Sequence, residues 1–259
     1  MNQLPSFAPV PERYVGLWRR RLLESETLRD TDTEVWWLQT GSLYADLRLP
    51  PAPADKRATP QLLAQQQGFA GELEVQDNLL TWHRWLDFQP PSGVADVGRV
   101  HFENGQLIEE GVLTSYREVW ERAAATSDDR LALALQSECA NGGEWRARHG
   151  VMVVLGEFFM FALDPGLRLS HGRAIQPGRA GAFAVFRLES EISFGIRHGR
   201  VPWEILRSTL PARVGMSLTA VHGLPEPDDT NVWQQRVPVP AALRRWQVVE
   251  LGAGFRGFR

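Results

Sequence analysis

Polar and aromatic side chains recur at every second position in several apolar segments of this sequence. Six of them form a candidate polar site: Asp46, Arg48, Glu72, Glu74, His83 and Trp85. Residues two apart in an extended strand point to the same face, so Asp46 and Arg48 share a face, as do Glu72 and Glu74. If this face lines a cavity, an arginine there could hold a carboxylate through two hydrogen bonds, and His83 could transfer protons.

The opposite faces of these segments are evenly aliphatic. They carry Leu43, Ala45, Leu47, Leu49, Leu73 and Val75. An antiparallel sheet commonly buries one face and leaves the other in water, and charged side chains are seldom fully buried. We therefore expect the aliphatic face to form the interior of the fold and the charged face to be solvated.

One arginine lies on an otherwise apolar face. In residues 79–88 this face holds Leu80, Trp82, Arg84, Leu86 and Phe88. A buried arginine must be paired or must reach water, because its burial otherwise costs several kcal/mol. Arg84, next to Trp82 on this face, is therefore our first candidate for anchoring an acidic ligand. The alternative is a structural arginine that pairs with a carboxylate or stacks on a tryptophan.

Short apolar segments alternate with turn residues along the whole chain, which contains 23 Gly and 17 Pro. This pattern is typical of an all-β protein, because chain reversals need residues with unusual dihedral angles or without an N–H group. Strands are expected at residues 14–23, 35–39, 42–49, 70–75, 79–88, 97–103 and 106–120, the last with a break, and then at 131–138, 143–148, 151–155, 158–163, 182–188, 191–197, 203–208 and 236–250. Asn104-Gly105 is the strongest hairpin signal, and Thr59-Pro60 predicts a short helix over residues 60–67.

The strand pattern pauses near residues 124–130 and then starts again. Each half has seven or eight short strands, which suits a closed barrel, since closure removes the exposed edges of a sheet. We expect an all-β protein with little helix and two antiparallel β-barrels in tandem, one over residues 1–125 and one over residues 126–259.

The first segments of the chain resemble those of a known superfamily. Gly16-x-Trp18, followed by Arg19, Arg20 and Arg21, resembles the first strand of calycin barrels, which include lipocalins and fatty-acid-binding proteins. Residues 18–23, 35–40 and 42–48 together resemble a family of twin-calycin proteins. Its best-known members are fungal proteins named for interacting with a casein-kinase-type protein kinase, and it has uncharacterised bacterial relatives. The likeness covers about the first 125 residues, and the second half only through residues 190–195 and 208–211.

The resemblance implies two calycin-like barrels side by side, with the tryptophan of Gly-x-Trp closing the barrel floor and often covered by an arginine. It implies no reaction, because the family has no catalytic motif to transfer. Calycin barrels can hold haem through one histidine, for which His83 or His101 would be the candidates. We expect no cofactor, with haem as the alternative.

The composition excludes several classes of protein. The net charge is −3, which argues against a dedicated nucleic-acid-binding protein. No apolar run reaches the ~18 residues of a membrane helix, and the first residues lack the pattern of a secretion signal. The single cysteine, Cys139, cannot form an internal disulfide, and no histidine or cysteine has metal-site spacing. We expect a cytoplasmic protein without a metal site.

These observations favour a binding protein that takes a small apolar or aromatic ligand. An acidic group on that ligand would meet Arg84 or Arg48. One alternative is an isomerase, lyase or cyclase with Asp46, Arg48 and His83 as its acid, base and anion clamp. Another is a scaffold that binds a protein partner or a second copy of itself. Exposed apolar surface would favour the scaffold.

Overall fold

The computed structural model describes residues 6–51, 59–89, 92–165, 190–198, 201–218, 225–226, 229–238, 241–255 and 257. The regular structure is nearly all β, as expected. Among the described residues, the helical elements are α1 (Pro60–Leu63) and the 3-10 turn η2 (Pro211–Arg213). In the described ranges no helix is long and apolar enough to cross a membrane.

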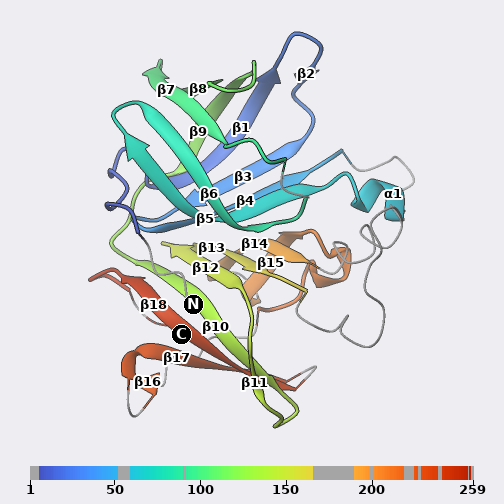
Figure 1. Cartoon of the computed structure of the whole chain (residues 1–259), viewed down its shortest axis with the longest axis vertical. Helices are drawn as coiled ribbons and strands as arrows, with labels where there is room; N and C mark the ends of the chain where they lie inside the picture. Colours follow the sequence, from blue (N-terminus) through green and yellow to red (C-terminus); the bar gives the residue numbers. More distant parts are fainter. Residues whose placement is uncertain are drawn as a thin grey trace.

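The first sheet closes into a barrel (Figure 1). Its elements are β1 (Gly16–Glu24), β2 (Arg29–Asp30), β3 (Glu34–Gln39), β4 (Leu43–Leu49), β5 (Gln67–Gln76), β6 (Leu79–Asp87), β7 (Val97–Glu103), β8 (Gln106–Gly111) and β9 (Arg117–Ala124). The antiparallel order runs β1-β3-β4-β5-β6-β7-β8-β9, and β9 pairs back with β1 to close the ring, while β2 adds to the end of β1. The chain therefore makes eight barrel strands by pairing neighbours in sequence.

Local sequence signals set the ends of several elements. Asn104 and Gly105 have φ of 49° and 81°, which is the left-handed pair that an Asn-Gly hairpin turn requires. The Thr59 hydroxyl accepts the Leu62 N–H at 3.2 Å and caps α1, as the sequence predicts. The helix is one turn shorter than the expected 60–67, because β5 already begins at Gln67.

The second sheet contains nine strands in the order β15-β14-β13-β12-β10-β18-β17-β16, with β11 beside β10. They are β10 (Arg130–Ala140), β11 (Trp145–Ala147), β12 (Gly150–Leu155), β13 (Phe158–Leu163), β14 (Glu191–His198), β15 (Pro202–Ser208), β16 (Pro225–Glu226), β17 (Asp229–Val237) and β18 (Ala242–Leu251). The strand expected over residues 236–250 is confirmed only in part: β17 ends at Val237 and β18 begins at Ala242, and Pro238, which lacks the N–H that a ladder needs, follows β17 directly. The strand expected at 182–188 lies outside the described residues.

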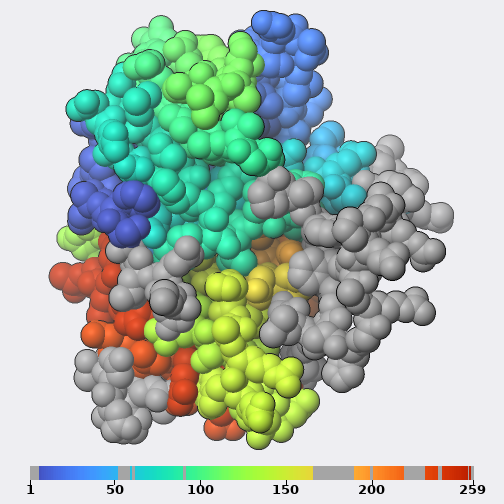
Figure 2. Space-filling view, viewed as in Figure 1, coloured from blue at the N-terminus to red at the C-terminus, as the bar shows by residue number. Residues whose placement is uncertain are grey.

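The two sheets are stacked as two layers (Figure 1), and in the space-filling view of Figure 2 the first half of the chain lies above the second. Barrel strands β3 and β4 pack on β12, β13 and β14. The rings of Trp36 and Phe194 stack across this boundary with centroids 4.9 Å apart. Arg207 on β15 forms an ion pair with Glu34 on β3 at 2.8 Å. A single hydrophobic cluster therefore spans the barrel wall and the second sheet.

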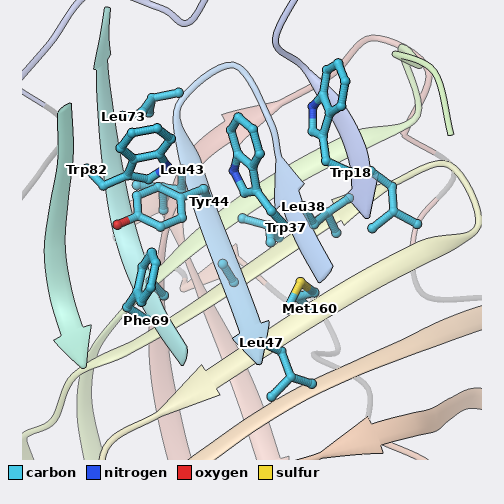
Figure 3. Packing of buried hydrophobic residues seen from close by; sticks show 14 of the residues in the cluster. Trp18, Trp37, Leu38, Leu43, Tyr44, Leu47, Phe69, Leu73, Trp82 and Met160 are labelled. Carbon is cyan, nitrogen blue, oxygen red and sulfur yellow. The ribbon is translucent and has the colours of Figure 1, made fainter. Parts of the chain in front are cut away.

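The orientation of β4 differs from the expectation. Its aliphatic residues face the second sheet, where Leu47 lies near Met160, and they do not face the barrel interior (Figure 3). Its polar residues Asp46 and Arg48 point into the barrel, and Asp46 is only 2% exposed. Both faces of β4 are covered, because the second sheet provides a second apolar environment behind the barrel wall. The expected solvated exterior for these charges is wrong.

Candidate functional site

A cavity of about 360 Å³ lies inside the barrel. It sits at the end where β1, β4, β6 and β8 finish and where β3, β5, β7 and β9 begin. Its charged lining residues are Asp46, Arg48, Arg84, Asp96, Glu109 and Glu118. Its aromatic lining residues are Trp37, Phe69, Trp82, Tyr116 and Trp120. Thr114 and Ser115, on the loop between β8 and β9, are exposed and form part of the mouth.

The opposite end of the barrel is closed by Trp18. This side chain is fully buried, and its indole N–H donates to the Tyr14 carbonyl at 2.8 Å. The Arg122 guanidinium lies over the Trp18 ring, 4.2 Å from its centroid, and donates to the Val15 carbonyl at 2.6 Å. The cavity therefore has one closed floor and one open end.

A chain of ion pairs links side chains of β1, β4 and β9 at the cavity. Arg48 Nε donates to Asp46 Oδ1 at 2.8 Å, and a second guanidinium nitrogen lies 3.4 Å from Glu118 Oε1. Arg20 reaches the same Glu118 oxygen at 2.7 Å and Asp30 at 2.7 Å. Burial raises the pKa of Asp46, and the Arg48 charge opposes that rise. These pairs satisfy each buried guanidinium with carboxylates.

Arg84 enters the cavity from β6. Its guanidinium pairs with Asp87 at 2.8 Å and with Asp96 at 2.5 Å. Two guanidinium groups lie over the Phe69 ring, with the Arg84 carbon 3.7 Å from the ring centroid and the Arg48 carbon 5.1 Å from it. Arg84 therefore matches the alternative role, that of a structural arginine. It has carboxylate partners and lies on an aromatic ring, although the ring is a phenylalanine and not the expected tryptophan.

Three tryptophans form the inner part of the cavity. Trp37 meets Trp82 and Trp120 edge to face, with centroids 5.9 Å and 5.6 Å apart. Figure 3 shows Trp37 and Trp82 on the barrel side of the sheet, together with Tyr44 and Phe69. The inner wall is thus aromatic, a surface that suits a flat or apolar molecule.

Glu109 is the most unusual group of the site. It lies on β8, is 4% exposed, and its two oxygens are bound by neutral donors. The Tyr116 hydroxyl donates to one oxygen at 2.7 Å, and the Trp120 indole N–H donates to the other at 3.0 Å. Burial, and then the nearby Glu118 carboxylate, raise the pKa of Glu109 to about 8. The group is thus mostly protonated at neutral pH.

The structure brings together four of the five ligand-binding residues expected from the sequence. Asp46, Arg48, Trp82 and Arg84 all line the cavity. His83 does not: its ring lies outside the barrel, stacked on Phe7 at 4.4 Å and 2.9 Å from Glu74. Adjacent residues of a strand point to opposite faces, so His83 and Arg84 cannot both point inward.

The other expected polar residues also lie outside the cavity. The Glu72 carboxylate accepts the Ser6 N–H at 2.7 Å on the outer side of β5. His101 is exposed on β7. The trio Asp46, Arg48 and His83 therefore does not converge, and neither candidate histidine can reach a haem inside the barrel. Within the described ranges, no group of three or more His, Cys, Asp or Glu is arranged to hold a metal ion.

Sequence reasoning missed Asp96, Glu109, Tyr116 and Glu118. A signal was present, because Glu109 shares a face with Leu107 and Glu118 shares a face with Trp120. A carboxylate on an apolar face indicates a paired or solvated group, by the same reasoning that applies to Arg84. Their meeting depends on the pairing of β8 with β9 and on barrel closure, which join residues far apart in sequence.

Comparisons with known proteins give a fold likeness. No protein-family model matches this chain, and no curated protein matches it. Among solved structures, it is similar to the uncharacterized protein YLR301w from Saccharomyces cerevisiae, with a TM-score of 0.56 and 14% sequence identity. The likeness covers 92% of this chain and 98% of the yeast chain. At this identity the similarity concerns the fold alone, and it extends over both sheets.

Proposed function

We propose that this protein binds a small, partly aromatic molecule in the cavity of its barrel. The observation that carries the proposal is the cavity itself, about 360 Å³ between three tryptophans and a layer of buried ionisable groups. Small-molecule sites are typically concave, have volumes from about 300 Å³ upward, and combine apolar walls with a few fixed polar groups. A closed floor and one open end give such a molecule a single route of entry.

We further propose that the barrel is calycin-like. Two features support this: its eight antiparallel strands follow one another around the ring, and Arg122 covers Trp18 of the Gly-x-Trp segment at the floor. A second calycin-like barrel in residues 126–259, and a relation to the kinase-interacting fungal proteins, remain predictions.

The acidic group expected on the ligand receives no support from the geometry. Arg84 is held by Asp87 and Asp96, and Arg48 by Asp46 and Glu118. An incoming carboxylate would have to displace a carboxylate that is already in place. The aromatic walls therefore carry the proposed binding, and the charge of the ligand is a separate question.

The proposal can be tested by screening the purified protein against aromatic acids, aromatic amines, aromatic alcohols and fatty acids. Thermal shift and native mass spectrometry would detect binding, and quenching of tryptophan fluorescence would place it near the inner wall. A Ser115→Trp variant should block the mouth and abolish saturable binding. Ser6→Trp, at an exposed position outside the barrel, is the matched control and should bind normally. If no compound of the panel binds, or if Ser115→Trp binds as well as the wild type, the result would count against a binding cavity.

A further inference from the structure

Glu109 differs from the other carboxylates around the cavity. Asp46 faces Arg48, Asp96 faces Arg84, and Glu118 is held by two arginines. Among the residues that the structure describes, no basic group lies within ion-pair distance of Glu109. Its two hydrogen-bond donors, the Tyr116 hydroxyl and the Trp120 indole, are neutral.

The charges around the cavity are also unbalanced. The network contains three arginines and six carboxyl groups: Arg20, Arg48 and Arg84 with Asp30, Asp46, Asp87, Asp96, Glu109 and Glu118. Every arginine of this network has carboxylate partners, so an anion finds no free cation in it. A cation, in contrast, finds one carboxyl group without a basic partner among the described residues, and more carboxyl groups than arginines.

The aromatic lining of the cavity also favours a cation over an anion. Faces of tryptophan and tyrosine rings attract cations electrostatically, more strongly when water is excluded. Trp120 and Tyr116 both line the cavity and both contact the Glu109 carboxyl group. A carboxylate flanked by aromatic rings is a chemical environment that suits a quaternary ammonium or protonated amine.

We infer that the ligand of this cavity is an organic cation whose positively charged group binds at Glu109, between Tyr116 and Trp120. This inference rests on the proposed binding function and specifies its substrate class. The contact formed is an ion pair between the ligand and the Glu109 carboxylate, with the aromatic part of the ligand against Trp37 and Trp82.

Binding of a cation at this position should depend on pH. Four ionisable groups from the surrounding elements face Glu109: Glu118 on β9, Tyr116 before β9, Asp96 before β7 and Arg48 on β4. Because burial and then Glu118 raise the pKa of Glu109 to about 8, a cation bound at neutral pH must displace a proton. Affinity should therefore increase between pH 6 and pH 9.

Three probes of similar shape test the inference. They are (2-phenylethyl)trimethylammonium, which is a permanent cation, 2-phenylethanol, which is neutral, and 3-phenylpropionate, which is an anion. Titration calorimetry would measure each at pH 6, 7.5 and 9. We expect the cation to bind tightest and to gain about tenfold or more in affinity from pH 6 to pH 9, since each pH unit below the pKa reduces the ionised fraction about tenfold. The neutral probe should show no such gain.

A matched pair of variants locates the effect. Glu109→Gln removes the charge and keeps an amide oxygen that can accept a hydrogen bond, so it should remove the pH dependence and weaken cation binding about tenfold at pH 9. Glu110→Gln changes the next residue on the strand, which is exposed on the outer face, and should bind like the wild type. The wild-type probe series is decisive by itself if a variant does not fold.

The outcomes separate the inference from the proposed function. Equal affinity for the three probes, or tightest binding of the anion, would overturn the cation inference and leave the binding function standing. A cation affinity that does not change in Glu109→Gln would also overturn it. If no probe of any charge binds, both the inference and the proposed function fail.

Discussion

Glu109 on β8 and Glu118 on β9 lie directly opposite each other, and both carboxyl groups are buried inside the barrel. Two like charges on facing strands repel each other, and burial strengthens the repulsion. The two carboxyl groups differ in the groups that bind them. Glu118 has Arg20 and Arg48, whereas Glu109 has only neutral donors. Glu118 is thus paired with two arginines, whereas the raised pKa of Glu109 keeps it largely protonated at neutral pH.

Glu109→Gln should stabilise the protein more at high pH than at low pH. The pKa of Glu109 is raised to about 8 in the folded state from its ordinary value of 4.5. The folded state therefore binds more protons, and stability is lost as pH rises through the folded pKa. We expect the variant's advantage in unfolding free energy to grow by about 2 kcal/mol between pH 6 and pH 9, as measured by urea unfolding. A constant difference, like the one expected for Glu110→Gln, would show that Glu109 is ionised throughout.

Removing one partner of the Asp46–Arg48 ion pair should lower the unfolding free energy more than replacing both partners by apolar residues. Removing one partner of a buried ion pair leaves an uncompensated charge, so Asp46→Leu should lose about 3 kcal/mol of unfolding free energy. Replacing both by apolar residues of similar size, in Asp46→Leu with Arg48→Met, should recover much of that loss. Equilibrium unfolding of both single variants and the double variant measures the coupling. Strict additivity of the two single effects would contradict it.

Arg122→Ala should destabilise the barrel floor. The side chain covers Trp18 and donates to the carbonyls of Val15 and Arg13, so its loss removes a cation–π contact and two hydrogen bonds. We expect a loss of about 2 kcal/mol, with little effect on ligand affinity because the cavity lies at the other end. Thermal unfolding would measure the loss. Arg99→Ala, at an exposed position on β7, is the control, and an equal loss there would remove the special role of Arg122.

Trp36→Ala should weaken the boundary between the two sheets. Its ring stacks on Phe194 with centroids 4.9 Å apart; Phe194 belongs to the buried cluster that joins the layers, and Trp36 packs against that cluster. Large-to-small changes in such contacts cost about 3 kcal/mol when the ring is mostly buried. Chemical unfolding followed by circular dichroism would measure the loss. Trp145→Ala, at a 36% exposed position on β11, should cost far less, and similar losses for both would contradict a shared core.

Turns and helix caps could be predicted from the sequence, because interactions between residues close together in the chain determine them. Asn104 and Gly105 adopt the positive φ values of their turn, and Thr59 caps α1. On β6, Leu80, Trp82 and Arg84 share a face as predicted, but a register shift between Arg84 and Leu86 breaks the alternation, so Leu86 does not continue that face into the cavity. These features depend on residues close together in the chain, where turn geometry, capping and alternation act directly.

The choice of the inner face of β4 could not be predicted from alternation. Leu47 and Asp46 define two distinct faces, but alternation does not say which apolar environment each one meets. The second sheet covers the aliphatic face, so the polar face takes the barrel interior and is stabilised there by Arg48, Glu118 and Arg20. These partners come from distant strands. The role of Glu109 could not be predicted for the same reason, because Tyr116, Trp120 and Glu118 together determine its environment.

Strands β3 and β4 are held from behind by the second sheet, so they cannot spread without separating the stacked layers. Across the ring from them lie β7 and β8, which the second sheet does not cover in this way. The loop that follows β8 carries Val112 and Leu113 exposed to solvent. The side of the barrel formed by β7 and β8 is therefore the one that does not pack on the second sheet. If the barrel holds a ligand as proposed, a crosslink between this loop and the one before β7 should slow its exit without altering the inner wall.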